Sequence, residues 1–280
     1  MQPTFLFIGP DKTGSTWLYQ ILRQHPDCHV PDLKDIYFFD RFYSRGVDWY
    51  FSLFDGAAPN SGAVGELSHD YLLSTVAAKR IAKDLPDVKL LTCLRDPVQR
   101  TFSHYLYMVR SGRTSISFET ALDRFPELIE NSLYAKHLRV YLELFPRDQI
   151  KVLFFEKLRA DPRGFAAEVF EFLRIPLVED LPYEERVLPA SRPRSMLVAR
   201  LAKLGAEVAR RAGMTSLVGR VKCHPLVVRT LYRPYDTRPK MDSATATRLR
   251  ERFRDDIVEL QTLLSVDLSH WLGQTEGADR

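Results

Sequence analysis

Short apolar runs alternate with segments of helical period along the first 175 residues, and this alternation limits the fold more than any other feature. Four runs are predicted to be strands: Thr4–Ile8, Ala63–Leu67, Val88–Leu94 and Ile150–Phe155. Most of their positions are apolar, which is typical of parallel strands covered on both faces. Helical spacing follows at Thr75–Leu85, from Asp96-Pro97 onward, at Asn131–Phe145 and at Pro162–Leu173. We therefore predict an α/β fold with three layers, in which helices flank a central parallel sheet.

Composition excludes several other classes of protein. The chain has 280 residues, of which 45% are apolar, enough for one sizeable core. Its longest apolar runs are four or five residues, far below the ~20 that a membrane span needs, and no basic region precedes an apolar run as in a signal peptide. Cys28, Cys93 and Cys223 are unclustered, so they indicate neither a disulfide framework nor a metal site. We expect a cytoplasmic protein.

The first strand runs into the loop Gly9-Pro10-Asp11-Lys12-Thr13-Gly14-Ser15-Thr16, and a helical pattern follows. A strand, a glycine-containing loop and a helix N-terminus together make an anion site, because backbone N–H groups and the helix dipole both favour negative charge. Gly9 and Gly14 keep the glycine spacing of a P-loop. Ser15, however, follows Gly14 where a P-loop has its lysine, and the lysine of this loop stands upstream at Lys12. The loop is therefore P-loop-like, and the shift argues against a magnesium-ATP enzyme.

This loop resembles the 5′-phosphosulfate loop of sulfotransferases that use 3′-phosphoadenosine 5′-phosphosulfate (PAPS). The likeness is greatest to the carbohydrate branch, with the heparan sulfate N- and 3-O-sulfotransferases and their bacterial relatives. The resemblance implies that Lys12 contacts the bridging oxygen and the sulfuryl group, with no metal required. The residues that it assigns to the 5′-phosphate region are Thr13, Gly14, Ser15, Thr16 and Trp17.

A second nucleotide element follows the third predicted strand. Arg95-Asp96-Pro97 and Ser103-His104-Tyr105 resemble the 3′-phosphate site of the same family. A guanidinium fork and a hydroxyl suit a terminal phosphate that ATP lacks. We interpret the intervening Arg100 as a structural or surface charge. Because this element accompanies the first loop, PAPS is the expected co-substrate.

Further segments extend the resemblance over about residues 3–175 and 236–272. Their order matches the family: Lys34–Asp40, Gly46–Tyr50, Gly65–Tyr71, Ser132–Tyr134 and Arg238–Asp242. In the family, a basic loop near the C-terminal end covers the nucleotide, a role that Arg238 or Lys240 would fill here. Residues 176–235 lie outside the resemblance and are expected to hold the acceptor-specific parts.

The catalytic base is left open among three residues. The resemblance places the base carboxylate of the heparan enzymes at Asp35, one methylene shorter than the family's glutamate, and Tyr37 replaces the neighbouring histidine. Glu66 and His69, at the end of the second predicted strand, are the alternatives. A histidine near this strand end is the base in the cytosolic branch, and histidine titrates near neutrality. Leu67 replaces a lysine of the family.

The acceptor is predicted less sharply than the nucleotide. From Arg192 to Lys240 the chain carries twelve Lys/Arg and two Asp/Glu, whereas its total net charge is +4. Such a basic block indicates an anionic ligand or surface, although a solvated helix face would also explain it. Candidate acceptor-binding residues are Tyr37, Tyr43 and Arg192. The segment Ser195–Arg211 is amphipathic, and we expect it either to pack on the core or to contact a membrane-proximal acceptor.

These features predict a single sulfotransferase domain over residues 1–280. We expect a PAPS-binding core at 1–175, an acceptor-specific, nucleotide-covering region at 176–240 and a terminal helix at 241–272 packed on the core. The acceptor is a small-molecule, glycan or lipid hydroxyl, or less readily an amine, and no nucleic-acid partner is expected. The alternatives are a P-loop-like kinase or nucleotidase, and a nucleotide-binding module without catalysis. Oligomeric state is not predicted.

Overall fold

The computed structural model describes residues 1–185, 191–195, 198, 201–202, 204–205, 230–235, 237 and 239–273. The chain divides into two compact units. Unit 1 comprises Met1–Arg95, Tyr134–Val187 and Thr262–Leu264, and unit 2 comprises Asp96–Leu133, Leu188–Gln261 and Ser265–Arg280. The single domain predicted over the whole chain, with its boundaries near 175 and 240, stays a prediction.

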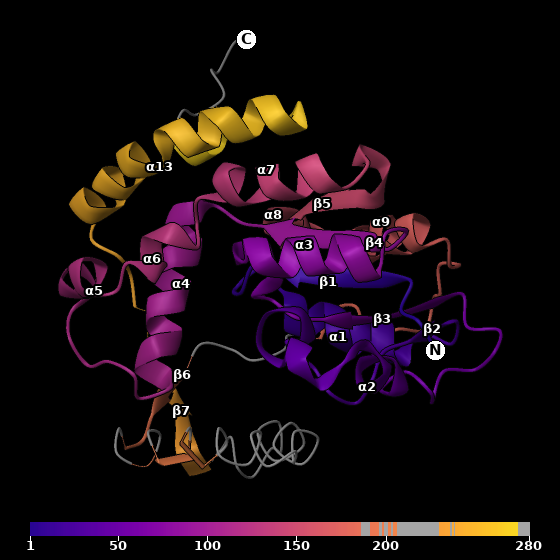
Figure 1. Cartoon of the computed structure of the whole chain (residues 1–280). Helices are drawn as coiled ribbons and strands as arrows, with labels where there is room; N and C mark the ends of the chain where they lie inside the picture. Colours follow the sequence, from indigo (N-terminus) through magenta and orange to yellow (C-terminus); the bar gives the residue numbers. More distant parts are fainter. Residues whose placement is uncertain are drawn as a thin grey trace. The chain divides into compact units, whose positions relative to one another are not determined.

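A five-stranded parallel sheet forms the centre of unit 1 (Figure 1). The strands stand in the order β2-β3-β1-β4-β5, so consecutive strands are joined by crossovers. Their bounds are β1 Phe5–Gly9, β2 Cys28–His29, β3 Ala63–Leu67, β4 Lys89–Leu94 and β5 Ile150–Phe154. Four of them match the predicted strands to within a residue at each end. The two-residue edge strand β2 was not predicted, because it is too short to carry a pattern.

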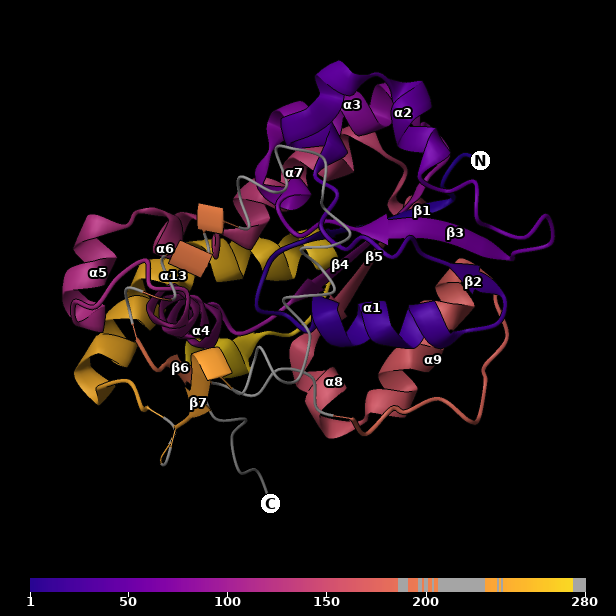
Figure 2. The same cartoon turned by 90° about the horizontal axis from the view of Figure 1, so that it is seen from below.

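Helices cover both faces of this sheet, as Figure 2 shows, with α1, α8 and α9 on one face and α3 and α7 on the other. Their bounds are α1 Ser15–Gln24, α3 Thr75–Asp84, α7 Tyr134–Leu144, α8 Phe155–Ala160 and α9 Pro162–Leu173, with the short helix α2 at Val47–Ser52. The predicted α/β fold with a parallel sheet between helices is therefore confirmed. Among the described residues, no helix has the length and apolar content to cross a membrane.

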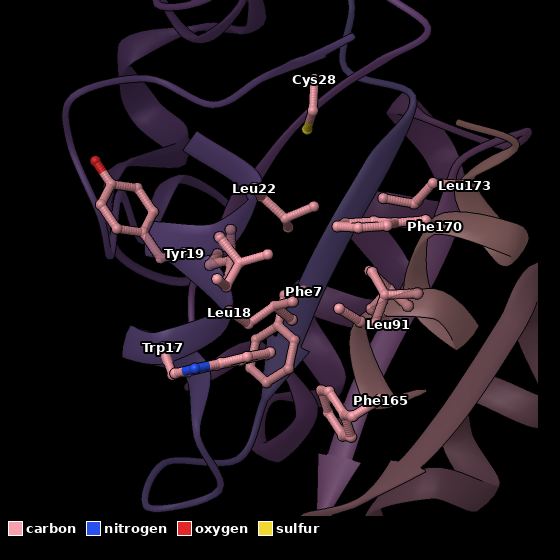
Figure 3. Close-up of a cluster of buried hydrophobic side chains, with 14 of the residues drawn as sticks. Phe7, Trp17, Leu18, Tyr19, Leu22, Cys28, Leu91, Phe165, Phe170 and Leu173 are labelled. Carbon is pink, nitrogen blue, oxygen red and sulfur yellow. The ribbon is translucent and has the colours of Figure 1, made fainter. Parts of the chain in front are cut away.

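Buried apolar side chains of the sheet, α1 and α9 form a core next to the loop between β1 and α1 (Figure 3). Phe7 of β1 and Leu91 of β4 pack with Leu18 of α1 and with Phe165 and Phe170 of α9. These side chains are all at most 1% exposed. The packing fixes the start of α1 above the carboxyl ends of β1 and β4, where ligands bind in open α/β sheets.

Unit 2 is built around α4 (Pro97–Arg110). The Asp96 carboxylate caps this helix, accepting hydrogen bonds from the N–H groups of Val98 at 2.8 Å and Gln99 at 3.2 Å. Arg100, fully buried, donates from Nε to Ser132 Oγ at 2.6 Å, which fits the structural role predicted for it. The other elements are α5 Phe118–Arg124, α6 Glu127–Glu130, the antiparallel pair β6 Ser191–Pro193 and β7 Tyr232–Pro234, and α13 Ser243–Leu264. The predicted helix over 195–211 lies largely outside the described residues.

Candidate functional site

The loop between β1 and α1 has the backbone shape of an anion cradle. Gly9, Lys12 and Gly14 have φ angles of 114°, 67° and 93°, in the left-handed region. Gly14 is the N-cap of α1, and no side chain caps this end of the helix. The first N–H groups of a helix have no acceptor within the helix itself. The N-terminus of α1 therefore presents donors and a positive dipole to an anion.

Three side chains hold this loop by donating hydrogen bonds to its carbonyl groups. The buried Thr13 hydroxyl donates to the Pro10 carbonyl at 2.7 Å, and the Thr92 hydroxyl donates to the Gly9 carbonyl at 2.5 Å. Arg95, only 8% exposed, donates from Nη1 to the Lys12 carbonyl at 3.2 Å. Three hydrogen bonds to its carbonyl groups thus help to hold the shape of the loop.

Gly9 also brings the end of β3 against the loop. A Cβ atom on Gly9 would lie 2.0 Å from the carbonyl oxygen of His69, a separation that real atoms do not tolerate. Ser68 N–H donates to the Phe7 carbonyl at 3.0 Å, which continues the register of β1 and β3. The backbone of His69 therefore touches the start of the phosphate loop, and only glycine at position 9 permits this approach.

His69 and Asp35, two of the three base candidates, form one hydrogen-bonded pair. Nδ1 of His69 lies 2.7 Å from Oδ1 of Asp35, and the same oxygen accepts from Nζ of Lys34 at 2.9 Å. The hydroxyl of Tyr37 lies 3.0 Å from Nε2 of His69. About a fifth of each of the Asp35 and His69 side chains is exposed, so solvent or a substrate can reach them. Asp35 and His69 were predicted as alternative bases, whereas the structure joins them in one hydrogen-bonded pair.

Neighbouring charges shift the pKa values of this pair in opposite directions. Burial would raise the pKa of Asp35, but the cations His69 and Lys34 outweigh it and hold that pKa well below its usual range. Burial likewise would lower the pKa of His69, but Asp35, and more weakly Asp70, raise it above its usual value of 6.5. The pair therefore favours an imidazolium beside a carboxylate.

Glu66, the third candidate, lies in a different environment. It is 1% exposed, and its carboxylate accepts hydrogen bonds from Ser68 Oγ at 2.6 Å, Tyr71 Oη at 2.8 Å and Tyr50 Oη at 3.0 Å. Burial raises the pKa of Glu66 to about 7, although the three hydroxyls oppose the shift. Glu66 is therefore enclosed by three hydroxyls, whereas Asp35 and His69 are partly exposed.

Comparison with known proteins identifies the family to which this arrangement belongs. A family model described as a sulfotransferase domain matches residues 2–191, more than half of the chain. The chain belongs to the sulfotransferase family. The structure of a sulfotransferase from Alicyclobacillus acidocaldarius superposes with a TM-score of 0.71 at 26% identity, covering 97% of this chain and 99% of that one.

Curated relatives of this sulfotransferase include heparan sulfate enzymes. Bifunctional heparan sulfate N-deacetylase/N-sulfotransferase 3 of Homo sapiens is 30% identical over 97% of this chain and 30% of its own length. Heparan sulfate glucosamine 3-O-sulfotransferase 3B1 of Mus musculus is 34% identical over 61% of this chain and 46% of its own length. The chain therefore spans less than half of each of these two proteins.

The structure assigns two predicted site residues of the sulfotransferase to other surroundings. The Trp17 side chain is 8% exposed, donates from Nε1 to the Tyr183 carbonyl at 3.0 Å and packs on Phe165, so only its backbone remains for the phosphate loop (Figure 3). Tyr43 lies under the Arg80 guanidinium, which is 4.3 Å from the Tyr43 ring centroid. Tyr43 thus contacts α3, whereas Tyr37 contacts the Asp35–His69 pair.

Unit 2 contains the remaining predicted residues. Ser103 is partly exposed on α4, and Lys240 is exposed before α13. Arg192 on β6 lies over the Tyr235 ring at 5.9 Å. Arg238 lies outside the described residues. The roles of Ser103 and Lys240 toward the nucleotide, and of Arg192 toward the acceptor, stay predictions.

The prediction from sequence missed three charged residues around the pair. Lys34 binds Asp35, as described above. Asp70 Oδ1 lies 3.4 Å from His69 Nε2, and Arg41 forms an ion pair with Asp70 while its guanidinium lies 3.9 Å from the Tyr37 ring centroid. Arg41 and Asp70 are neighbours only through the fold, so sequence spacing gave no signal for their contact.

Proposed function

We propose that this chain transfers the sulfuryl group of PAPS to a hydroxyl of a carbohydrate acceptor. One observation carries the proposal: the uncapped N-terminus of α1 and the Asp35–His69 pair meet at the same sheet edge, through the contact of His69 with Gly9. The N-terminus of α1 can bind a phosphosulfate, and the Asp35–His69 pair can take a proton from the acceptor. Family membership supports the same reaction class.

The residues of the loop fit the 5′-phosphosulfate end of PAPS. Positive φ angles at Lys12 and Gly14 turn successive N–H groups of the loop and of α1 to one side, as in backbone anion nests. The ammonium of Lys12 supplies the cation that stabilises charge on the leaving phosphate oxygen. By resemblance, Arg95 and Ser103 are assigned to the 3′-phosphate, which distinguishes PAPS from ATP.

His69 is the better base of the pair. A carboxylate whose pKa lies far below neutrality is a weak proton acceptor, and Asp35 is held in that state by Lys34 and His69. An imidazole ordinarily titrates near neutrality, and Asp35 raises the pKa of His69 further, so His69 is a stronger proton acceptor than that carboxylate. When His69 is neutral, Asp35 orients the ring through Nδ1 and stabilises the imidazolium that forms as Nε2, beside the Tyr37 hydroxyl and Asp70, takes the acceptor proton.

The reaction that these residues support balances without a further reactant. The acceptor oxygen forms a bond to sulfur, and the bond between sulfur and the 5′-phosphate oxygen breaks. The acceptor proton passes to Nε2 of His69, and the leaving phosphate keeps the electron pair beside Lys12. The Tyr37 hydroxyl lies 3.0 Å from Nε2 in the structure, and the acceptor hydroxyl would replace it there. Positioning and charge stabilisation carry the catalysis, as in phosphoryl transfer.

A carbohydrate is the proposed acceptor because the curated relatives are named for heparan sulfate and for its glucosamine. A hydroxylated natural product or lipid, and transfer to an amine, are the other acceptor classes to be tested. The acceptor-specific role proposed for residues 176–240 and the cytoplasmic location belong to the same proposal.

The proposal is tested with purified protein and PAPS carrying labelled sulfate. We expect label to appear in a heparan-type polysaccharide from a panel that includes desulfated glycans, sterols and phenols. We also expect 3′-phosphoadenosine 5′-phosphate to raise the melting temperature more than ATP with magnesium does. No transfer to any acceptor, together with greater stabilisation by magnesium-ATP, would contradict the proposal and favour a kinase-like protein.

A further inference from the structure

The backbone that carries the base pair is held in an unfavourable conformation. Asp35 and Tyr37 have φ angles of 64° and 55°, in the left-handed region that residues with side chains seldom adopt. Two such residues within three positions persist only where their surroundings fix them, and such strain gathers at functional sites. Something in unit 1 must therefore hold residues 35–39 in place.

Hydrogen bonds to this segment come from the last residues of β3 and from the turn after it. Asp35 N–H donates to the Leu67 carbonyl at 3.0 Å. Tyr37 N–H donates to Ser68 Oγ at 3.1 Å, and Phe39 N–H donates to Tyr71 Oη at 3.4 Å. Two of these three acceptors are side-chain hydroxyls, and both are fully buried.

Each of these two hydroxyls is in turn fixed by Glu66. Ser68 Oγ donates to Oε2 of Glu66 at 2.6 Å, and Tyr71 Oη donates to Oε1 at 2.8 Å. Because the carboxylate takes the hydroxyl proton of each, the hydroxyl oxygens are left to accept from the backbone of Tyr37 and Phe39. A buried chain of this kind orders its members strongly, since an unmade bond would leave a polar group without a partner.

We propose that Glu66 is a positioning residue for the sulfuryl transfer: through the hydroxyls of Ser68 and Tyr71 it holds residues 35–39 so that Asp35 and Tyr37 meet His69. The inference rests on the proposed function of His69 and Asp35. It gives Glu66, the third candidate for the base, a role that a buried side chain can fill without contacting a substrate. Glu66 acts on the reaction through other residues and touches neither substrate.

Tyr50 provides a matched control. Its hydroxyl donates to the same Oε1 of Glu66 at 3.0 Å, but it comes from α2, and the structure gives it no hydrogen bond to residues 35–39. Tyr50→Phe and Tyr71→Phe each remove one buried hydroxyl from Glu66 and keep the ring. They differ in one respect: the Tyr71 hydroxyl accepts a hydrogen bond from residues 35–39, and the Tyr50 hydroxyl does not.

The test compares Ser68→Ala, Tyr71→Phe and Tyr50→Phe for stability, kinetics and the pKa of His69. We expect comparable losses of stability in the two tyrosine variants. Ser68→Ala and Tyr71→Phe should lower kcat about tenfold with an unchanged KM for PAPS, and Tyr50→Phe should lower it less. Histidine NMR titration should show the pKa of His69 falling toward its usual value in the first two variants, because Asp35 loses its alignment.

Two outcomes separate the inference from the proposed function. If kcat and the His69 titration in all three variants follow the loss of stability alone, Glu66 is a structural residue and the inference is overturned. If the titrations change as expected while the wild-type chain transfers no sulfate, the positioning role stands and the proposed function fails. Glu66→Gln, which keeps the shape and offers a single acceptor oxygen, should behave like Ser68→Ala.

Discussion

The phosphate loop and the base pair occupy one sheet edge but are built in different ways. The loop from Gly9 to Thr16 is continuous in sequence, and its backbone N–H groups make the proposed contacts with the anion. The base pair joins Asp35, before α2, to His69, after β3, and its chemistry lies wholly in side chains. A backbone site needs particular φ angles, whereas a side-chain site needs particular neighbours.

This difference explains how the two regions tolerate change. The loop keeps its glycines and its lysine, because a Cβ on Gly9 would strike His69 and the φ angle of Gly14 favours glycine. At the base pair, Tyr37 stands where the resemblance expects a histidine, and in the function that we propose the imidazole comes from His69 instead. A side-chain function can move between elements provided that the fold returns it to the same place.

Lys12→Ala tests the loop and should have the largest effect. We expect kcat for sulfate transfer to fall by about 10²–10³-fold, because one charge-stabilising group at the leaving oxygen is lost. Lys79→Ala on the exposed side of α3 is the control and should keep full activity with the same melting temperature. Full activity of Lys12→Ala in the labelled-sulfate assay would remove the loop from the reaction.

His69→Ala tests the other region. We expect kcat to fall by about 10²-fold or more, as for removal of a general base. The affinity for 3′-phosphoadenosine 5′-phosphate, measured by calorimetry, should stay unchanged, because the loop makes the nucleotide contacts. His29→Ala, on the edge strand β2 of the same unit, should leave both quantities unaltered. If His69→Ala lost nucleotide binding as well as activity, His69 would also be needed for the nucleotide site, which contradicts separate roles for the loop and the base pair.

Gly9→Ala tests the contact between the regions. Gly46 also has a positive φ, 83° with ψ 152°, and nothing lies within 4 Å of a built Cβ, so Gly46→Ala should cost only the backbone strain of about 1–3 kcal/mol. Gly9→Ala adds the clash with His69, and overpacking should cost about 1–3 kcal/mol more. Chemical denaturation measures both values. Equal losses in the two variants would contradict the close approach of His69.

Asp35→Asn tests the pairing through pH. Asp35 raises the pKa of His69, so removing its charge lowers that pKa, and the acid limb of the kcat/KM profile should move to lower pH. Maximal activity should fall about tenfold, because the imidazolium that forms is less stabilised. Asp70→Asn should shift the limb in the same direction by less. An acid limb that stays in place would mean that Asp35 and His69 act separately.

Sequence patterns predicted most of unit 1 and only part of its site. Strands such as Ile150–Phe154 and helices such as Pro162–Leu173 carry strong apolar patterns and well-marked starts, so their bounds were nearly correct. The phosphate loop was recognisable because its residues are adjacent. The pairing of Asp35 with His69 was not, because it depends on a left-handed backbone at Asp35 and on the register of β1 with β3.

Glu66 shows what burial adds to a sequence pattern. A carboxylate at a strand end is a reasonable candidate for the base, and the three surrounding hydroxyls are the observation from which we propose a positioning role for Glu66. Trp17 is a similar case, since its position beside the loop suggested the nucleotide while its side chain fills the core. In both cases the direction of the side chain decided the outcome, and that direction depends on packing that one sequence does not reveal.

The most direct test is a crystal structure of the chain with 3′-phosphoadenosine 5′-phosphate and a glycan acceptor. We predict that the 5′-phosphate accepts hydrogen bonds from the N–H groups at the start of α1 and contacts Lys12. We also predict that the acceptor hydroxyl lies within hydrogen-bond distance of Nε2 of His69, with Nδ1 still on Asp35. A phosphate bound elsewhere, or an acceptor that meets another residue while His69 is turned away, would contradict the proposed function.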